Sequence, residues 1–558
     1  MTALQSSSEM MANKRFKRDS QRVAFLLCVG FCGYGVMRKV RSSVGCPLSG
    51  RYNEGDTMSF EKKLIGKILD PIHGTIMITD IERQVIGHRL FQRLRNVKQN
   101  TFLYKVFPSS MHSRFEHSLG VMHVAYLMFD NLRLNSYRYL EKYKDGIVFP
   151  NLDRVSEEHI QELRLAALLH DVGHGPMSHQ FDSFLMGKSQ LISVLGDQFS
   201  DIYELIKDED SVEHEHISLV FIKKIIQDLK LNSLVNVDNV IKLVESKYKG
   251  GQVNIYIDDD CFDIQPLFTS LISSCPIDAD RMDYLLRDSY FSGVKCGIYN
   301  IERLLKSIVP VVDSRKICLA YKESCLDSIS EFIFARSNLF SQVYYHKTNR
   351  AFSAMLGKVC QLALADGKDH LVNDMYKLEK EHDGYNLDLL QEFYLDNSDD
   401  VFINMTVPNL VKGNPIAINL VNDIVDRKPW KKLYESKVYL SSLSILDSVD
   451  KEMVNEIKRH MSDELIKYFG KDSFIIDIMT DNAFKDIDKT EIKLLRKTPD
   501  GKYQPYKISE CGEKLDMYQT VRYFIRVFVD ASVIGSEIKT ISSALDTIKT
   551  RLVSQNSL

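Results

Sequence analysis

The chain has 558 residues, of which 44% are hydrophobic and 26% are charged. This composition is typical of a soluble globular protein, and it excludes a chain that is disordered throughout or a collagen-like repeat. The 72 basic and 75 acidic residues give a formal net charge of −3. No global charge therefore draws the chain to nucleic acid or to an anionic membrane, and an anionic ligand has to be bound by a local cluster of cations.

The first 57 residues differ in character from the rest of the chain. Basic residues at 14–22 precede an apolar run at 23–37, which is short for a membrane span and resembles the core of a signal peptide. Further basic residues follow at once, and the run lacks a small-residue cleavage site. We therefore expect residues 1–57 to be a dispensable or disordered extension, with a membrane anchor and an export signal as alternatives.

Cysteine usage bears on the compartment. The ten cysteines are scattered, without a CxxC pair of metal-binding spacing. This pattern favours reduced thiols and a cytoplasmic location, or a nuclear one in a eukaryote.

Helical periodicity dominates the chain up to about residue 385. Apolar residues at three- and four-residue spacing predict helices over 81–100, 115–132, 157–171, 211–230, 277–290 and 323–365, and a helical insertion or loop over 190–210. Ser156 is a favourable N-cap for the third helix, and the Gly/Pro-rich segment 172–176 ends it. The predicted fold class is mainly α, with one enlarged helical core over residues 58–385.

The pattern changes after residue 385. Helical spacing continues from 416 to 434, but residues 473–479 and 491–496 have the composition of strands. Residues 498–501, Thr-Pro-Asp-Gly, form a turn signal between two extended runs. We expect residues 386–558 to form a smaller helical and α+β lobe with a role in oligomerisation or regulation.

Histidine placement indicates the chemistry. His170 continues the apolar stripe of the 157–171 helix, so its imidazole is expected to point into the core beside Asp171. His117 shares the apolar face of the 115–132 helix. In the 277–290 segment, four polar side chains share one helical face, which suggests the lining of a cleft: Asp280, Tyr284, Arg287 and Asp288.

Buried imidazoles and carboxylates need partners, which a metal ion supplies. Two imidazoles and two carboxylates form a mixed N/O ligand set that suits Fe, Mn, Zn or Ni and leaves positions open for water. The alternative is that each histidine is a core residue satisfied by a hydrogen bond. The joint pattern of His117, then His170-Asp171 and a downstream Asp280 favours the metal.

Three segments resemble the HD-domain phosphohydrolases: 114–121 (RFEHSLGV), 169–179 (LHDVGHGPMSH) and 277–284 (IDADRMDY). The resemblance is closest to the SAM-and-HD-domain deoxynucleoside triphosphate triphosphohydrolases and their bacterial dGTPase-like relatives. It covers about residues 66–435, including 70–74, 91–99, 336–347 and 426–431, without a SAM domain. It implies a metal-dependent enzyme that hydrolyses dNTPs to deoxynucleoside and inorganic triphosphate. It also implies a homo-oligomer, from a dimer to a tetramer or larger, and a possible activating nucleotide.

The resemblance also assigns roles to residues. It implies metal ligation by His117, His170, Asp171 and Asp280, with Mg²⁺ on the substrate phosphates, and catalysis by His179, Asp182 and His214. The residues implied to bind substrate are Gln99, Arg114, His174, Arg281, Tyr284, Asp288, Arg336 and Tyr344. A regulatory nucleotide would contact Lys67, Gln92, Arg95, Lys322 and Arg427.

Some positions depart from the family pattern. Gly87, beside His88, stands where the mammalian-type enzymes read the guanine of an activator with an acid. Asn100 replaces an apolar residue near the base, and Phe340 replaces a histidine near the active site. Base preference and activation therefore do not transfer from the family to this chain.

Two other functions are alternatives. An HD phosphohydrolase or phosphodiesterase acting on a monophosphate, a cyclic nucleotide or (p)ppGpp would have no need of the 336–347 segment. A nucleotide-sensing or nucleic-acid-binding module is disfavoured by the balanced charge and by the lack of interleaved basic and aromatic runs. For a triphosphohydrolase, the sequence leaves two sites of water attack as alternatives, the α-phosphorus and a terminal phosphate. Lowering the dNTP pool suits nucleotide balance or defence against a virus or phage.

Overall fold

The computed structural model of the chain describes residues 59–556 except 144–148, 197–198, 208–210, 258–259, 365–366, 379–386, 442–446, 482–491, 500, 509, 511–519 and 534–536. The expected extension over 1–57 lies outside the described residues. The chain divides into two compact units, residues 1–77 and 78–558. Each unit is described by itself.

The described part of the first unit is a short 3-10 helix and a hairpin. η1 (Ser59–Lys63) precedes β1 (Gly66–Asp70) and β2 (Gly74–Ile78), which pair in a two-stranded sheet. The Asp70 carboxylate accepts hydrogen bonds from the backbone N–H groups of Ile72 (2.8 Å) and His73 (2.7 Å), and Gly74 supplies the positive φ of 75° that the turn needs. Lys67 lies in β1.

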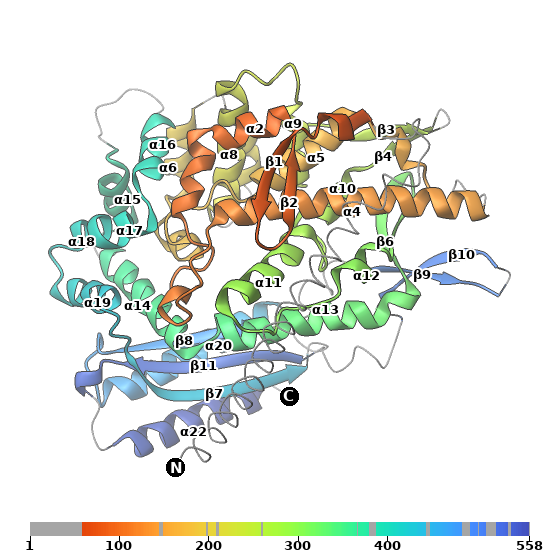
Figure 1. Cartoon of the computed structure of the whole chain (residues 1–558). Helices are drawn as coiled ribbons and strands as arrows, with labels where there is room; N and C mark the ends of the chain where they lie inside the picture. Colours follow the sequence, from red (N-terminus) through yellow and green to blue (C-terminus); the bar gives the residue numbers. More distant parts are fainter. Residues whose placement is uncertain are drawn as a thin grey trace, which may run out of the picture. The chain divides into compact units, whose positions relative to one another are not determined.

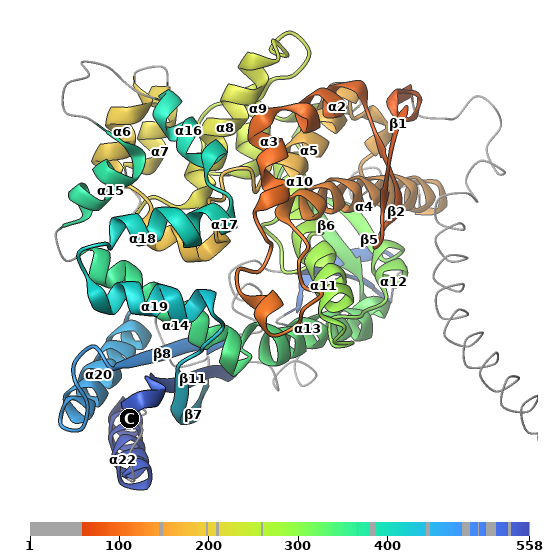
Figure 2. The ribbon, with the colours of Figure 1, turned by 60° about the vertical axis from the view of Figure 1, so that its left-hand side comes forward.

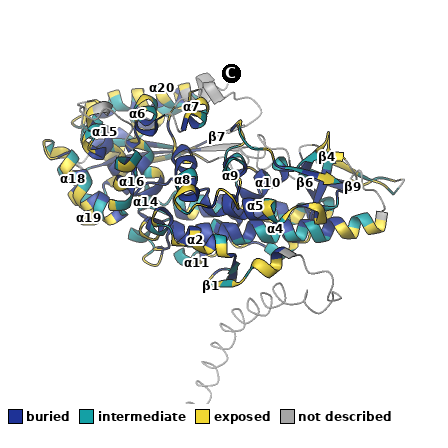
Figure 3. Cartoon of the chain, turned by 90° about the horizontal axis from the view of Figure 1, so that it is seen from above, coloured by how far each residue is buried: buried dark blue, intermediate teal, exposed yellow. Residues whose placement is uncertain are grey.

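Helices form most of the second unit, and three of them carry the site. α4 (Arg114–Tyr143) packs against α5 (Glu157–Leu169) and α11 (Ala279–Ser292), as Figure 1 shows. α5 is buried over most of its length (Figure 3), because apolar residues occupy several of its faces. Its Ser156 Oγ accepts a hydrogen bond from the backbone N–H of His159, so the predicted N-cap is confirmed.

The other helices surround this core (Figure 2). Before α11 they are α2 (Asp80–Gly87), α3 (Arg89–Gln92), α6 (Lys188–Leu195), α7 (Ser200–Ile206), α8 (His214–Asp228), α9 (Val237–Val244) and α10 (Gln265–Ile272). After α11 come α12 (Ile301–Leu305), α13 (Leu326–Leu339), α14 (Lys347–Ala363), α15 (Lys368–Tyr376), α16 (Leu387–Asp396), α17 (Asp399–Val401), α18 (Val407–Leu410) and α19 (Pro415–Val425).

Short 3-10 and π segments join or extend several helices. The 3-10 segments are η2 (Arg93–Asn96), η3 (Leu103–Lys105), η4 (Leu152–Arg154), η5 (Ser178–Phe184), η7 (Glu323–Cys325) and η14 (Ala531–Val533). The π-helical segments are η8 (Phe340–Tyr344) and η10 (Phe402–Thr406).

Two sheets complete the second unit. The larger one has the order β10-β9-β6-β4-β3, with β5 also paired to β6. Its strands are β3 (Asn254–Ile257), β4 (Asp260–Asp263), β5 (Ile308–Asp313), β6 (Lys316–Lys322), β9 (Lys493–Lys497) and β10 (Tyr503–Lys507). β6 pairs with β9 in parallel, with Ala320 opposite Lys493, so the predicted C-terminal hairpin extends a sheet formed by earlier strands.

The smaller sheet forms the rest of the C-terminal lobe. β7 (Lys431–Ser441), β11 (Thr520–Val529) and β8 (Phe474–Asp481) are antiparallel in that order. α20 (Asp447–Ile466) and α22 (Ile538–Asn556) pack on it. The core between sheet and helices includes Met461, Leu465, Ile525, Val527 and Leu545.

The mainly α fold class with a smaller α+β lobe is confirmed. Several predicted elements are nevertheless wrong in extent. The single helix predicted over 81–100 is interrupted at His88, whose extended backbone (φ −69°, ψ 140°) and Nδ1 instead cap α3. The helix predicted over 323–365 is interrupted by η8.

The sequence patterns misplaced the start of β7 and did not predict the β5–β6 hairpin. The helix predicted to reach Tyr434 ends at Val425, because Arg427 adopts a φ of 58° and Pro429 follows, after which β7 begins. The β5–β6 hairpin was missed, since its turn uses Ser314 (φ 53°) and Arg315 (φ 63°) at left-handed positions that Asn and Gly usually occupy. Among the described residues, no helix is both long and apolar enough to span a membrane.

Candidate active site

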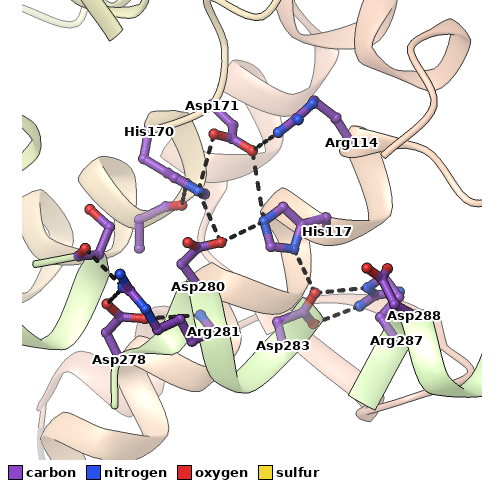
Figure 4. Close-up of polar contacts among 12 residues, drawn as sticks. Arg114, His117, His170, Asp171, Asp278, Asp280, Arg281, Asp283, Arg287 and Asp288 are labelled. Atoms are coloured by element: carbon purple, nitrogen blue, oxygen red, sulfur yellow. Dashed lines mark hydrogen bonds and ion pairs between the residues drawn. The ribbon is translucent and has the colours of Figure 1, made fainter. Parts of the chain in front are cut away.

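Four predicted metal ligands meet where α4, α5 and α11 pack together; we call them the His/Asp cluster (Figure 4): His117, His170, Asp171 and Asp280. Nε2 of His117 lies 3.0 Å from Oδ1 of Asp280 and 3.7 Å from Oδ2 of Asp171. Nε2 of His170 lies 3.5 Å from Oδ1 of Asp171 and 3.9 Å from Oδ1 of Asp280. These four side chains therefore direct ligand atoms into one small volume.

The other nitrogen of each imidazole is already engaged. Nδ1 of His117 lies 2.7 Å from Oδ2 of Asp283, which is itself paired with Arg287 at 2.8 Å, and Nδ1 of His170 lies 2.9 Å from the carbonyl oxygen of Ala167. The two Nε2 atoms are buried and make no hydrogen bond. Imidazoles that are oriented through one nitrogen and unsatisfied at the other fit a divalent metal ion, the commonest partner of such a pair beside carboxylates.

The charges within the cluster are coupled. Burial lowers the pKa of His117, but the adjacent carboxylates of Asp280 and Asp283 outweigh burial and raise that pKa to about 10. Burial raises the pKa of Asp171, but the charges of His170 and Arg114 hold it well below its usual range. A proton and a metal ion compete for His117 Nε2, so metal binding is expected to weaken as the pH falls.

Three more histidines form a second group, the three-histidine cluster: His174, His179 and His214. The rings of His174 and His214 stack with centroids 3.6 Å apart, while the His179 side chain is 65% exposed. Asp182 lies 3.4 Å from Nδ1 of His179 and 3.5 Å from Nδ1 of His214. Nε2 of His174 lies 3.4 Å from Oδ1 of Asp171, which joins this cluster to the His/Asp cluster.

The two stacked imidazoles have different electrostatic surroundings. Burial and the charge of Arg114 place the pKa of His174 well below its usual value. Burial also lowers the pKa of His214, but Asp182 and Glu215 outweigh it and raise that pKa. Burial raises the pKa of Asp182, whereas hydrogen bonds to His179 and His214 bring it down to about 2. The pKa values of the two stacked imidazoles are thus shifted in opposite directions.

A close backbone approach brings α8 to the site. A side chain at Gly173 would collide with the backbone of His214 and Ser218, so only glycine lets the His170–His174 turn lie directly on α8. Gly120 likewise lets α4 lie close to α11, since a side chain at this position would overlap Asp283 and Arg287.

Asp288 organises the end of the site farther along α11. Its carboxylate accepts hydrogen bonds from Asn100 Nδ2 (3.0 Å) and from the Tyr344 hydroxyl, and it lies 2.5 Å from Nε2 of His112. Tyr284 lies one turn before Asp288, with its ring 6.4 Å from that of Tyr344. Arg336 contributes a hydrogen bond and a positive charge to Tyr284. Gln99 lies beside this group, with its backbone N–H bonded to the carbonyl of His112.

The two arginines predicted to hold phosphates have different surroundings. Arg114 Nη1 pairs with Asp171, and its Nε donates to Ser178 Oγ at 2.9 Å, so its guanidinium lies at the His/Asp cluster. Arg281 Nη1 donates to the carbonyl oxygens of Ser273 and Cys275, both at 3.2 Å, and to Asp278. The structure thus engages Arg281 at the start of α11, and its role toward phosphate stays a prediction.

The predicted regulatory residues of the second unit are Gln92, Arg95, Lys322 and Arg427, and each makes a hydrogen bond within that unit. Arg95 Nε donates to Gln92 Oε1 at 2.9 Å and stacks on Phe115. Lys322 Nζ donates instead to the carbonyl of Lys306 at 3.0 Å, and Arg427 Nε to the carbonyl of Lys105 at 2.9 Å. Lys67 belongs to the first unit.

The sequence analysis missed three residues that support the site: Arg93, His112 and Asp283. Buried Arg93 donates to the carbonyl oxygens of His174 (2.7 Å) and Val172, and burial lowers its pKa to about 10. Asp283 could have been found, because it lies three residues after Asp280 and four before Arg287 on α11. Arg93 and His112 carry no comparable local signal, since their partners are distant in the sequence.

The helices that carry the site match a known protein family. The HD domain family model matches residues 114–288, which include α4, α5, α8 and most of α11. Residues 114–288 are thus similar to HD domains. Members of this superfamily are metal-dependent hydrolases, and the resemblance expected from the sequence is confirmed.

Individual relatives agree with the family match. The chain is 30% identical to the uncharacterized protein YwfO of Bacillus subtilis over 301 residues, covering 53% of this chain and 55% of the relative. It is also 30% identical over 326 residues to the deoxynucleoside triphosphate triphosphohydrolase SAMHD1 homolog of Dictyostelium discoideum, covering 58% of this chain and 53% of the relative. The chain thus spans about half the length of these relatives.

A solved structure supports the fold. The crystal structure of a hypothetical protein from Aquifex aeolicus aligns with a TM-score of 0.55 and 22% identity, covering 86% of this chain and all of that protein. At this identity the likeness supports the fold alone.

Proposed function

We propose that the protein is a metal-dependent dNTP triphosphohydrolase that converts a deoxynucleoside triphosphate into a deoxynucleoside and inorganic triphosphate. The observation that carries the proposal is the continuity of the site: contacts run from the His/Asp cluster to the three-histidine cluster on one side and along α11 to Asp288 on the other. A row of polar and charged side chains of this kind would suit a long, charged substrate. The Dictyostelium relative, whose name states this activity, supports the proposal.

In this function the metal would be held by His117, His170, Asp171 and Asp280. Fe, Mn, Zn or Ni suits these ligands, and when bound such an ion lowers the pKa of a water ligand and polarises a phosphoryl oxygen. The rest of the chemistry belongs to the protein. Arg114 supplies positive charge beside the His/Asp cluster, and at the three-histidine cluster Asp182 and Glu215 raise the pKa of His214 against the effect of burial.

Proton transfer and sugar recognition complete the proposed mechanism. Exposed His179, oriented by Asp182, is within reach of solvent and can pass a proton to the leaving oxygen. The Asp288–Tyr344 pair would bond the sugar hydroxyl, and Tyr284 would pack against the sugar where a ribonucleotide carries its 2′-hydroxyl. A hydroxyl at that position would lose its hydration without gaining a partner, which favours deoxynucleotides.

Regulation and assembly belong to the same proposal. An activating nucleotide would bind the cations Lys67, Arg95, Lys322 and Arg427 with Gln92, and the protein would act as a homo-oligomer. The outcome to look for is a dNTPase rate that rises when a second nucleotide is added and when the protein associates.

The test is product analysis with the full chain. Each of the four dNTPs, and a mixture of them, is incubated with protein and Mg²⁺ or Mn²⁺, with the Asp171→Ala variant as a matched control. Deoxynucleoside and triphosphate formed by the wild type alone support the proposal. No turnover of any dNTP, or hydrolysis confined to monophosphates, cyclic nucleotides or (p)ppGpp, would overturn it in favour of another HD phosphohydrolase activity.

A further inference from the structure

Asp399, a buried carboxylate on α17, joins two distant loops. Asp399 is only 2% exposed. Oδ2 accepts a hydrogen bond from the backbone N–H of Lys98 at 2.9 Å, and Oδ1 accepts one from the backbone N–H of Met177 at 2.7 Å. These donors lie 301 and 222 residues away along the chain, so one carboxylate fixes two segments that have no sequence proximity.

Both loops carry residues of the proposed site. Lys98 precedes Gln99 and Asn100, and Asn100 bonds Asp288. Met177 precedes Ser178 and His179, a member of the three-histidine cluster. The position of each loop therefore sets the position of side chains that the proposed function uses.

Direct contacts tie the same loops to each other. Ser178 Oγ donates to the carbonyl of Lys98 at 2.7 Å and accepts from Arg114 Nε at 2.9 Å. Thr101 Oγ1 donates to the carbonyl of Met177 at 2.6 Å. Asp399 adds a hydrogen bond to each of the two loops. Because Ser178 also contacts Arg114, and Arg114 pairs with Asp171, a shift of either loop would displace Arg114 and Asp171 as well.

The second loop needs such an anchor because of its backbone. Met177 and Ser178 have φ values of 66° and 51°, a left-handed conformation that residues with a side chain adopt rarely. Strain of this kind persists only where the surroundings hold it, and it is concentrated at functional sites. The N–H of the first strained residue is the one bonded to Asp399.

We propose that Asp399 is a positioning residue of the active site, whose two carboxylate oxygens set the spacing between the loop of Gln99 and the loop of His179. It acts through the backbone of Lys98 and Met177 and does not itself contact substrate. The identity of that substrate rests on the proposed function.

The neighbouring Asp400 provides a matched control. Both carboxylates lie near the Lys98 ammonium, Asp399 at 3.7 Å and Asp400 at 3.6 Å. The Asp400 side chain is 78% exposed, and the two loop N–H groups are bonded to Asp399. Asp400→Asn thus removes the charge beside Lys98 and leaves the two backbone hydrogen bonds intact.

The experiment compares Asp399→Asn, Asp399→Glu and Asp400→Asn in the full chain. The readouts are kcat and KM for a dNTP, the dissociation constant of inorganic tripolyphosphate by calorimetry, metal content and the thermal midpoint. Asn keeps one acceptor oxygen, and Glu keeps both oxygens on a stem one methylene longer, so neither can make both bonds in the wild-type geometry. We expect kcat to fall about 10- to 100-fold and tripolyphosphate binding to weaken about 10-fold in both, with metal content retained and Asp400→Asn close to the wild type.

Three results would overturn the proposal: wild-type kcat and tripolyphosphate affinity in the Asp399 variants, loss of metal in proportion to activity, or an equal loss in Asp400→Asn. If Asp399→Asn is recovered only unfolded, Asp399→Glu decides by the same measures. A wild type that binds tripolyphosphate but hydrolyses no dNTP contradicts the proposed function alone, and the role of Asp399 is then judged by tripolyphosphate binding.

Discussion

The two histidine groups of this site share one aspartate and differ in almost everything else. In the His/Asp cluster both imidazoles are buried, and each has one nitrogen fixed by Asp283 or by the carbonyl of Ala167. In the three-histidine cluster His179 is 65% exposed, and its recorded ion-pair partner is an aspartate at 3.4 Å. The first group is held rigidly in the interior, whereas the second faces solvent at one edge.

This difference separates two chemical tasks. A metal ligand must keep its geometry, which burial and a second hydrogen bond provide. A residue that exchanges protons with solvent needs access, which His179 has, and a positioned partner, which Asp182 provides for both His179 and His214. The contrast can be tested because it assigns metal loss to one group and a change of rate without metal loss to the other.

The largest effect is expected from the His/Asp cluster. His170→Ala or Asp171→Ala removes a ligand, so metal content should fall to background and kcat should fall about 1,000-fold or more. Elemental analysis and product assays on the same preparations measure both. His370→Ala, at a surface histidine that is 65% exposed, is the control. A metal-depleted variant that still turned over substrate at the wild-type rate would show that the assigned ligands are wrong.

Removing His179 should separate rate from metal. His179→Ala is expected to lower kcat about 100- to 10,000-fold, the usual range for loss of a general acid or base, while metal content stays at the wild-type level. The exposed position makes a folding defect unexpected, and the thermal midpoint checks this. If metal content fell together with kcat, the two groups would form one binding site and the contrast would fail.

A smaller effect is expected from the support of His117. Asp283→Asn weakens the hydrogen bond to Nδ1 of His117 and removes the negative charge that pairs with Arg287. Metal affinity should therefore fall about 10- to 100-fold, and excess metal should restore activity. Titration of activity against metal concentration gives the affinity. Asp130→Asn, which disrupts a pair with Arg133 on the same helix, is the control. An activity loss that excess metal does not restore would mean that Asp283 supports the fold alone.

How much of this could be foreseen depends on the distance between partners in the sequence. His170 and Asp171 are adjacent, and Asp280, Tyr284 and Asp288 repeat at helical spacing, so the sequence predicted that they share a site. The support of the same site comes from remote residues. Arg93 reaches the carbonyl of His174 across 81 positions, and no periodicity marks such a pair.

The errors in the fold have a related cause. The β5–β6 turn is made by Ser314 and Arg315 in a left-handed conformation, and their residue types give no turn signal. The strand pairing of β6 with β9 links residues about 170 positions apart, which patterning cannot detect.

The smallest effect concerns Asp182, which tunes the three-histidine cluster. Because Asp182 raises the pKa of His214, that histidine loses its proton only as the pH rises through the raised value. Asp182→Asn removes this influence, so the alkaline limb of the kcat profile should move down by about one pH unit with metal content unchanged. The pKa of Asp182 is lowered to about 2, so its contribution to stability is present above its ordinary value of 3.8 and is lost as the pH falls through about 2.

The variant should therefore lose stability at neutral pH and lose less on acidification than the wild type does, as urea unfolding at several pH values would measure. Partial exposure of the Asp182 side chain screens the interaction, which keeps both effects small. An alkaline limb that did not move would assign the proton transfer to a group that Asp182 does not touch.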